Sequence, residues 1–335
     1  MHLAPAPQVA PRDVVSGLDD PGDPRAVAAA FAALIPGLAA PLPGGGCTWA
    51  RLELLAHVAE CSPALARLVE GHLDAVAILA ELDGAVPGNA RLGVWAAEPG
   101  GRAVGATRTS AGWRLRGTKP YASGAGTLTH ALVTARDGDR RLLFLVPAGL
   151  ADPVPGTWAA VGMAGSESPD VTIDAVVPAD AVVGGAGAYL DRPGFWHGGV
   201  GVAACWHGGA VGVAAPLRQS AAAGRASAHG LAHLGAVEAD LAASDASLRA
   251  AATEIDADPD DRAGAAERRT RLVRAIVEGA ATRTLEHVGR ALGAGPLCHD
   301  RAHARRVADL TVYLRQSHAE GDLEILGRLL AVDRS

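Results

Sequence analysis

The spacing of hydrophobic residues divides the chain into a helical part, a part rich in strands, and a second helical part. Up to about residue 91, apolar residues recur every three or four positions, as on a helix with one buried face. From residue 92 to about residue 188 the period falls to two, in short runs broken by Gly, Pro and Ser. Helical spacing returns from residue 189. This pattern predicts an α+β fold.

Four segments follow from the pattern. Residues 1–24 are rich in Pro and Asp and are expected to form a loose N-terminal arm. Residues 25–91 are predicted to form a short helical domain, and residues 92–188 a small, mostly antiparallel β-barrel. Residues 189–335 are predicted to form a four-helix bundle, because four long helical stretches follow one another with short links. These stretches lie at about 198–215, 231–255, 265–292 and 302–330, the last with a bend near Gly321.

Composition and charge narrow the class of protein. The chain has 335 residues, of which 49% are hydrophobic, which is ample for a sizeable core. The net charge is -6 without long runs of one sign, so nothing points to a nucleic-acid-binding surface. The N-terminus has no basic segment followed by an apolar run, and we see no apolar stretch of about 20 residues that would span a membrane. A cytoplasmic protein is therefore expected.

The cysteines give no sign of a metal or redox site. The four are widely spaced and form no Cys-x-x-Cys pair, so we expect isolated buried thiols in a reducing compartment. They are Cys47, Cys61, Cys205 and Cys298.

Two motifs close strands in the middle of the chain. The first reads Ala97-Glu98-Pro99-Gly100, and the second, some twenty residues later, reads Gly117-Thr118-Lys119-Pro120-Tyr121-Ala122-Ser123. Their order, spacing and helical flanks resemble the acyl-CoA dehydrogenase family. Members of that family carry a Thr-Glu-Pro-Gly strand end and a Gly-x-Lys-x-Trp-Ile-Thr strand, and both line a flavin. The resemblance implies a short N-terminal helical domain, a central β-barrel and a C-terminal four-helix bundle.

The resemblance also implies an FAD site at these strand ends. Trp95, Ala96 and Ala97 would line one edge of the flavin ring. Tyr121 would lie against the ring in place of the family's Trp, and Ser123 would present a hydroxyl near N5 in place of its Thr. Taken without the resemblance, Tyr121 is equally a surface aromatic residue and Ser123 a turn residue.

A second cofactor contact is implied near the end of the third long helix. Gly293, Ala294 and Gly295 occupy the place of a glycine-rich segment that reaches the FAD of a neighbouring subunit in the family. A homodimer or homotetramer is therefore expected. The alternative is an ordinary helix stop, with a terminal Gly followed by Pro296.

The family's catalytic carboxylate is missing from both of its usual positions. One position, eight residues past the Asp of an Arg-Asp pair, is Ser317 here, and the other, on the first bundle helix, is Val202. Three readings stay open. A displaced Glu320 or Glu324 takes the role; His318 takes it, as a group that can act as acid or base near neutral pH; or His318 is a plain helix residue.

Other histidines are weaker candidates. His197 and His207 each adjoin a Trp and either face the flavin pocket or pack in an interface. The basic cluster from His299 to Arg306 either meets a phosphate or is a solvated helix start. His299 and His303 have the spacing of metal ligands but no acidic or Cys partner nearby, so no metal site is predicted.

The predicted function is an FAD-dependent oxidoreductase that transfers hydride from an acyl thioester to flavin N5. Two alternatives remain: a flavin-dependent monooxygenase on the same fold, and a non-catalytic scaffold. The expected partner is a small molecule, either an acyl-CoA or another acyl or aromatic compound, with neither nucleic acid nor membrane.

Overall fold

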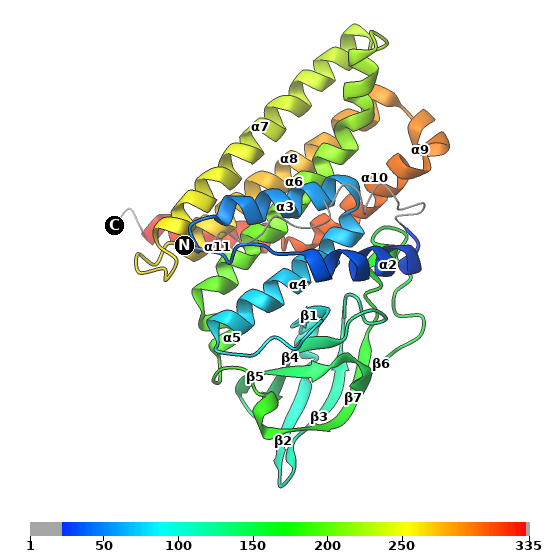
Figure 1. The fold of residues 1–335 in the computed structure, drawn as a ribbon. Coiled ribbons are helices and arrows are strands. Elements are labelled where there is room, and N and C mark those ends of the chain that lie inside the picture. The colour runs from blue at the N-terminus through cyan, green and yellow to red at the C-terminus, as the bar shows by residue number, and fades with distance from the viewer. Residues whose placement is uncertain (1–21, 333–335) are drawn as a thin grey trace.

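The computed structural model describes residues 22–332, in which a curled β-sheet lies against one side of a helical layer (Figure 1). The arm predicted for residues 1–24 lies almost wholly outside the described residues. The first described helix, α2 (Pro24–Leu34), begins where that arm was expected to end. The Asp23 carboxylate caps it by accepting a hydrogen bond from the N–H of Arg25 at 3.1 Å.

Two helices of the N-terminal part meet at a one-residue corner. They are α3 (Thr48–Cys61) and α4 (Pro63–Glu81), and Ser62 separates them. The Ser62 hydroxyl accepts a hydrogen bond from the N–H of Leu65 at 3.2 Å, and Pro63 takes the first helical position, where its missing N–H costs nothing. α4 packs against β1 of the sheet on one side and against helices that include α3, α6 and α2 on others.

The sheet has seven strands and curls into an open, barrel-like layer. Its centre is β4, which pairs with β5 along one side; along the other, β1 pairs with the first half of β4 and β2 with the second. The order then continues through β3 and β7 to β6. Four of the six pairings are antiparallel, as expected. The strands are β1 (Leu92–Trp95), β2 (Val104–Thr109), β3 (Gly112–Lys119), β4 (His130–Asp137), β5 (Arg140–Pro147), β6 (Ala151–Pro153) and β7 (Val171–Val177).

Three long helices follow the sheet after the short α5 (Ala188–Asp191): α6 (Pro193–Ala222), α7 (Ala228–Ala257) and α8 (Ala266–Leu292). α6 packs against both of the others and also against α3. By length and composition α6 could cross a membrane, which the sequence pattern had not suggested. In the fold, however, 72% of its most apolar window is buried among neighbouring helices, and this burial accounts for its composition.

The prediction of one long fourth helix is wrong. The chain instead forms α9 (Gly295–His299), α10 (Arg301–Tyr313), a 3-10 turn (Leu314–Gln316) and α11 (Glu320–Val332). The break lies before Gly321, at Ala319, whose φ of 46° is left-handed and cannot continue a helix. Apolar residues continue on both sides of the break, so hydrophobic spacing alone could not locate it.

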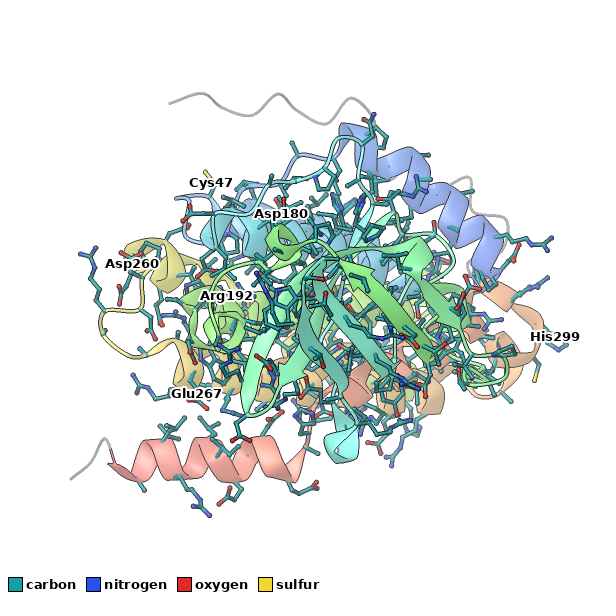
Figure 2. The ribbon with its side chains drawn as sticks, turned by 90° about the horizontal axis from the view of Figure 1, so that it is seen from below. Cys47, Asp180, Arg192, Asp260, Glu267 and His299 are labelled. Atoms are coloured by element: carbon teal, nitrogen blue, oxygen red, sulfur yellow. The ribbon has the colours of Figure 1, made fainter. Side chains whose placement is uncertain are left out.

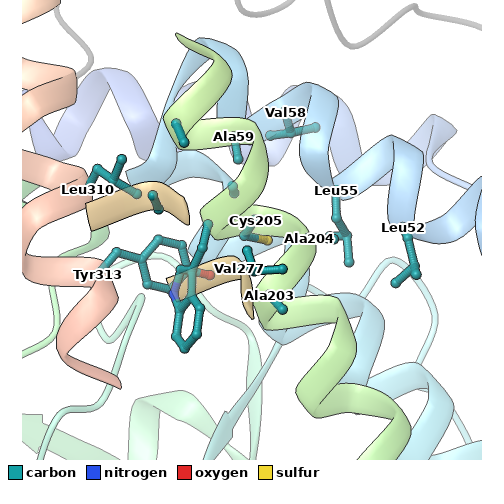
Figure 3. Close-up of a cluster of buried hydrophobic side chains, with 14 of the residues drawn as sticks. Leu52, Leu55, Val58, Ala59, Ala203, Ala204, Cys205, Val277, Leu310 and Tyr313 are labelled. Carbon is teal, nitrogen blue, oxygen red and sulfur yellow. The ribbon is translucent and has the colours of Figure 1, made fainter. Parts of the chain in front are cut away.

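The N-terminal helices and the bundle share one hydrophobic core. It runs from Val27 and Phe31 on α2, through α3 and α6, to Leu310 and Tyr313 on α10. Figure 3 shows Leu52, Leu55 and Val58 of α3 facing Ala203, Ala204 and Cys205 of α6. The sheet has its own core on the inside of its curl, which includes Trp113 and Phe144 in edge-to-face contact.

The expectation of four buried thiols holds only for Cys205. Cys47 and Cys298 are exposed, Cys61 is half-buried, and all four are free (Cys47 is labelled in Figure 2).

Candidate functional site

A cleft of about 710 Å³ lies between the ends of two strands and the helical layer. Pockets that hold small molecules and cofactors usually measure roughly 300–1,000 Å³. Its walls come from the segments after β1 and β3, from α4, from the beginning of α6, from α8, and from the turn between α10 and α11. The site is therefore assembled from segments more than 200 residues apart in the sequence.

The strand ends form one wall. Ala96 and Ala97, directly after β1, line the cleft, and so do Tyr121 and Ser123, shortly after β3. Trp95 does not line it. It is 1% exposed and points into the core of the sheet, where its indole N–H donates to the carbonyl oxygen of Ser123 at 3.1 Å. Trp95 thus connects the two strand ends from behind.

The backbone at this wall brings both Tyr121 and Ser123 to the cleft. Tyr121 has a φ of 55°, uncommon for a residue with a side chain, and is 56% exposed. The Ser123 hydroxyl accepts hydrogen bonds from Arg67 Nε at 3.3 Å and from the Ser168 hydroxyl at 2.9 Å. The Ser168 hydroxyl lies 3.0 Å from that of Ser166, which also lines the cleft. A connected row of hydroxyls therefore borders this wall.

A buried ion cluster supports the strand ends from the inside of the sheet. Lys119, which is 0% exposed, donates to the Thr134 hydroxyl at 2.9 Å and to the Ala97 carbonyl at 3.4 Å. Its Nζ lies 3.6 Å from the carboxylate of Glu98, which also receives hydrogen bonds from Arg136 at 2.9 Å and Arg141 at 2.8 Å. The cluster fixes the backbone of Ala97 where the strand leaves the sheet.

These contacts shift the pKa values of both central groups. Burial alone would raise the pKa of Glu98, but the hydrogen bonds from Arg141 and Arg136 and the charge of Lys119 outweigh it and lower the pKa to about 2. Burial lowers the pKa of Lys119 to about 8, against the attraction of Glu98. Glu98 is therefore ionised throughout the physiological range.

The helical wall carries aromatic groups near the start of α6. Phe195 and Trp196 line the cleft, followed by Gly198, Gly199 and Val202. Arg274 of α8 holds this wall against the turn after α10, because it donates to the carbonyl of Gly199 at 3.3 Å and to that of Gln316 at 3.0 Å.

α4 brings charge to the cleft. Arg67, Glu70 and Asp74 lie on one face of the helix and all line the cleft. Arg67 donates to the Glu70 carboxylate, so the two form an ion pair. Burial raises the pKa of Glu70 and that of Asp74, against the attraction of nearby arginines. None of these three residues was predicted from the sequence to belong to the site, although their spacing of three and four within an otherwise apolar helix indicates a polar stripe.

His318, the predicted catalytic residue, lies at the rim. Its side chain is 83% exposed, and its Nδ1 is 3.6 Å from the carboxylate of Asp322. It belongs to the segment between α10 and α11 rather than to a helix. The alternative carboxylates, Glu320 and Glu324, are exposed and do not line the cleft, although Asp322 does.

The predicted glycine-rich contact lies apart from this cleft. Gly293, Ala294 and Gly295 are exposed between α8 and α9, and Gly293 ends α8. A contact with the cofactor of a second subunit stays a prediction.

The remaining histidines have structural partners. His197 Nε2 lies 3.0 Å from the Pro259 carbonyl, and His207 Nδ1 lies 2.9 Å from the Ser244 hydroxyl, so both pack between helices and neither lines the cleft. The backbone N–H of His303 donates to Asp300, the N-cap of α10. Among residues 22–332, no group of three or more potential ligands could hold a metal ion.

Solved structures identify the fold. The sequence matches no protein-family model and no curated protein. TdsC from Paenibacillus sp. A11-2, solved with FMN and indole, is 18% identical over 96% of this chain and 95% of its own, with a TM-score of 0.77. KijD3, solved with FMN and a dTDP-amino-keto-sugar, is 18% identical over 99% and 96%, with a TM-score of 0.75. XiaF from Streptomyces sp., solved with FADH2 and glycerol, is 21% identical over 90% and 86%, with a TM-score of 0.70.

The chain has the acyl-CoA dehydrogenase fold. Within this fold, the cleft has the features that a flavin requires. Ala96, Ala97 and Tyr121 provide a flat wall at the strand ends, and small side chains let a ring approach the backbone closely. Ser123 and the neighbouring hydroxyls supply hydrogen-bonding groups at its edge. The residues that line the cleft therefore fit a flavin.

Proposed function

We propose that the protein is a flavin-dependent monooxygenase, which inserts one atom of dioxygen into a small organic molecule. The observation that carries this proposal is the composition of the cleft and its border. The strand-end wall suits a flavin, while Val202 in the cleft and Ser317 next to it occupy the two positions where the sequence resemblance would put the catalytic carboxylate of an acyl-CoA dehydrogenase. Removal of the α-proton of a thioester needs such a base. TdsC, a dibenzothiophene monooxygenase, has the same fold with FMN, and this likeness favours oxygenation over dehydrogenation.

The cofactor of the proposal is a reduced flavin, either FMN or FAD. When bound, it supplies two electrons to dioxygen, so that one oxygen atom enters the substrate and the other leaves as water. Ala96, Ala97, Tyr121 and Ser123 would hold its ring. Phe195 and Trp196 line the cleft and would present apolar surface to a bound substrate.

The substrate would be a small organic molecule, because the cleft must hold both flavin ring and substrate in about 710 Å³. We further propose a cytoplasmic homodimer or homotetramer, with Gly293, Ala294 and Gly295 next to the flavin of a partner subunit.

The test is a turnover experiment with the full chain. We expect the protein to bind reduced FMN or FAD and, with indole as a probe, to transfer ¹⁸O from ¹⁸O₂ to the product by mass spectrometry. Anaerobic bleaching of the oxidised flavin by acyl-CoA would instead support a dehydrogenase, and failure to take up either flavin would support a scaffold.

Variants of single residues distinguish those that bind the flavin from those that take part in catalysis. Ser123→Ala removes the hydroxyl that Arg67 and Ser168 contact, and we expect it to weaken flavin binding. Full activity in His318→Ala would show that the exposed imidazole has no catalytic role.

A further inference from the structure

On the α4 side of the cleft, the carboxylate of Asp74 has no hydrogen-bond donor among the described residues. Arg67 is fully engaged, because it pairs with Glu70 and donates from Nε to Ser123. Glu70 has therefore a charged partner within the same helix turn. Asp74, one turn further along, accepts no hydrogen bond from the described residues, although it lines the cleft.

Charges on the surrounding elements do not occupy Asp74. Arg51 of α3 donates to the Pro41 carbonyl, and Arg192, just before α6, donates to Glu81 at 2.8 Å. Both cations lie close enough to attract Asp74, and Glu81 and Glu70 repel it. The Tyr189 hydroxyl of α5 also lies near this carboxylate. Arg67 attracts this carboxylate as well, but burial outweighs the three arginines and raises the pKa of Asp74. None of the described residues donates a hydrogen bond to its carboxylate oxygens, so these are free to accept one from a ligand.

Helix α6 approaches Asp74 closely at a glycine. Gly198 of α6 faces it so closely that a Cβ there would lie 2.7 Å from Asp74 Oδ1. A side chain at Gly198 would therefore collide with this carboxylate, and glycine is what allows Asp74 to stay at the edge of the cleft beside α6. Phe195 and Trp196 precede Gly198 on α6 and line the same cleft as Asp74, so a single ligand there can meet both aromatic surface and the acceptor.

A second buried polar group, the Tyr313 hydroxyl, borders the cleft. Tyr313 of α10 lines the cleft, is 1% exposed, and its hydroxyl forms no hydrogen bond to an oxygen or nitrogen of the described residues. It lies beside the Cys205 thiol and within the electrostatic reach of Glu70 and Arg67. A thiol is a weak hydrogen-bonding partner, so this hydroxyl keeps the capacity to bond a ligand in the cleft.

We propose that Asp74 selects the substrate by accepting a hydrogen bond from an N–H or O–H group attached to an aromatic ring. This inference rests on the proposed function, because the substrate concerned is that of the flavin-dependent reaction. Aromatic walls bind the ring, and the carboxylate distinguishes rings with a donor from rings of the same shape without one. Such discrimination is strong because a wrong ligand would leave a desolvated carboxylate without a partner.

The test compares two probes of equal shape. Indole carries a ring N–H, and benzothiophene has a sulfur at the same place. Calorimetric titration of the FMN-loaded protein should give an indole Kd about tenfold or more below that of benzothiophene. In Asp74→Leu this preference should disappear through weaker indole binding, while Asp74→Asn, which keeps an acceptor oxygen, should retain part of it.

The control is Asp180→Leu, an exposed carboxylate outside the cleft, which should keep the full preference. Flavin affinity and the melting temperature of each variant report whether the cleft remains intact. Equal affinities for the two probes in the unaltered protein, an unchanged preference in Asp74→Leu, or binding of neither probe would each overturn the inference. Loss of flavin binding in the unaltered protein would instead refute the proposed function, and titration without FMN still tests Asp74 in that case.

Discussion

Glu98 is the residue on which the shape of the strand-end wall most depends. Three cations, Lys119, Arg136 and Arg141, converge on its carboxylate, and Lys119 has no contact with solvent. Removal of one partner of a buried ion pair is strongly destabilising, because it leaves the other charge uncompensated. Glu98 therefore acts on the cleft indirectly, by holding Lys119 and, through it, the carbonyl of Ala97.

The pKa of Glu98 predicts a stability loss in acid. Its folded pKa of about 2 lies below the ordinary value of 4.5, so its contribution is fully present above about pH 4.5 and is lost as the pH falls towards 2. The difference corresponds to about 3 kcal/mol. We expect Glu98→Gln to be less stable than the unaltered protein at pH 7 and to lose less stability between pH 4.5 and 3.

Urea unfolding at a series of pH values measures how steeply the free energy of unfolding falls with pH in Glu98→Gln and in the unaltered protein. Asp174→Gln is the control, because that carboxylate pairs with Arg114 at the exposed face of the sheet. Parallel slopes for Glu98→Gln and the unaltered protein would contradict the assignment.

At the scale of elements, α6 depends on residues without side chains. Its Gly208 and Gly212 lie against the backbone of α3, where an added Cβ would come within 1.9 Å of the Ala56 carbonyl oxygen and 2.3 Å of that of Glu60. Because backbone cannot move aside as a side chain can, the two helices would have to separate. This close approach joins the N-terminal helices to the bundle and so sets the width of the cleft above the sheet.

Alanine should therefore have opposite effects at two helical glycines. Gly208→Ala should lower the free energy of unfolding by about 2 kcal/mol or more, through overpacking. Gly235→Ala in α7, where nothing lies within 4 Å of the added Cβ, should raise it by about 0.5–1 kcal/mol, because alanine favours the helix. Urea unfolding measures both, and a tolerated Gly208→Ala would refute the close contact as a constraint.

At the scale of the whole molecule, the cleft exists only where the sheet and the helical layer meet. The strand ends supply one wall, and helices of the helical layer supply the others. A ligand bound there contacts both layers and should stabilise them together; at a flavin concentration of about 100 times Kd the gain is about 2.7 kcal/mol.

The exposed α8–α9 junction tests whether the site needs a second copy of the chain. A side chain at Gly295 meets nothing within 4 Å in the single chain, and its φ is not left-handed. Gly295→Val should therefore leave the melting temperature of the flavin-free protein unchanged. If the junction borders a partner's flavin, the flavin Kd should rise about tenfold, a loss of about 1.4 kcal/mol. An unchanged Kd, in a protein shown by sedimentation to be oligomeric, would make the contact predicted from Gly293, Ala294 and Gly295 wrong.

Much of the architecture is readable from periodicity. The change from a helical period to a period of two, and back, marked the helical, strand and helical parts, and the fold matches. The strand ends at Ala96, Ala97, Tyr121 and Ser123 meet at one cleft. They do so because β1 and β2 pair with successive parts of β4, and β3, antiparallel to β2, ends beside the start of β2 and so near the end of β1. The break near Ala319 was not readable, since nothing in hydrophobic spacing reports a left-handed backbone.

The amino-acid sequence by itself determined the order of layers and the chemistry of the strand ends, because period and turn residues act between neighbours in the chain. Only the tertiary structure decided which polar groups meet in the cleft. Arg67 contacts Ser123 across 56 residues, and Asp74 faces Gly198 across a still longer interval. The cost of burying a charge depends on partners that the fold brings near, so neither the free carboxylate of Asp74 nor the exposure of His318 is written in local sequence.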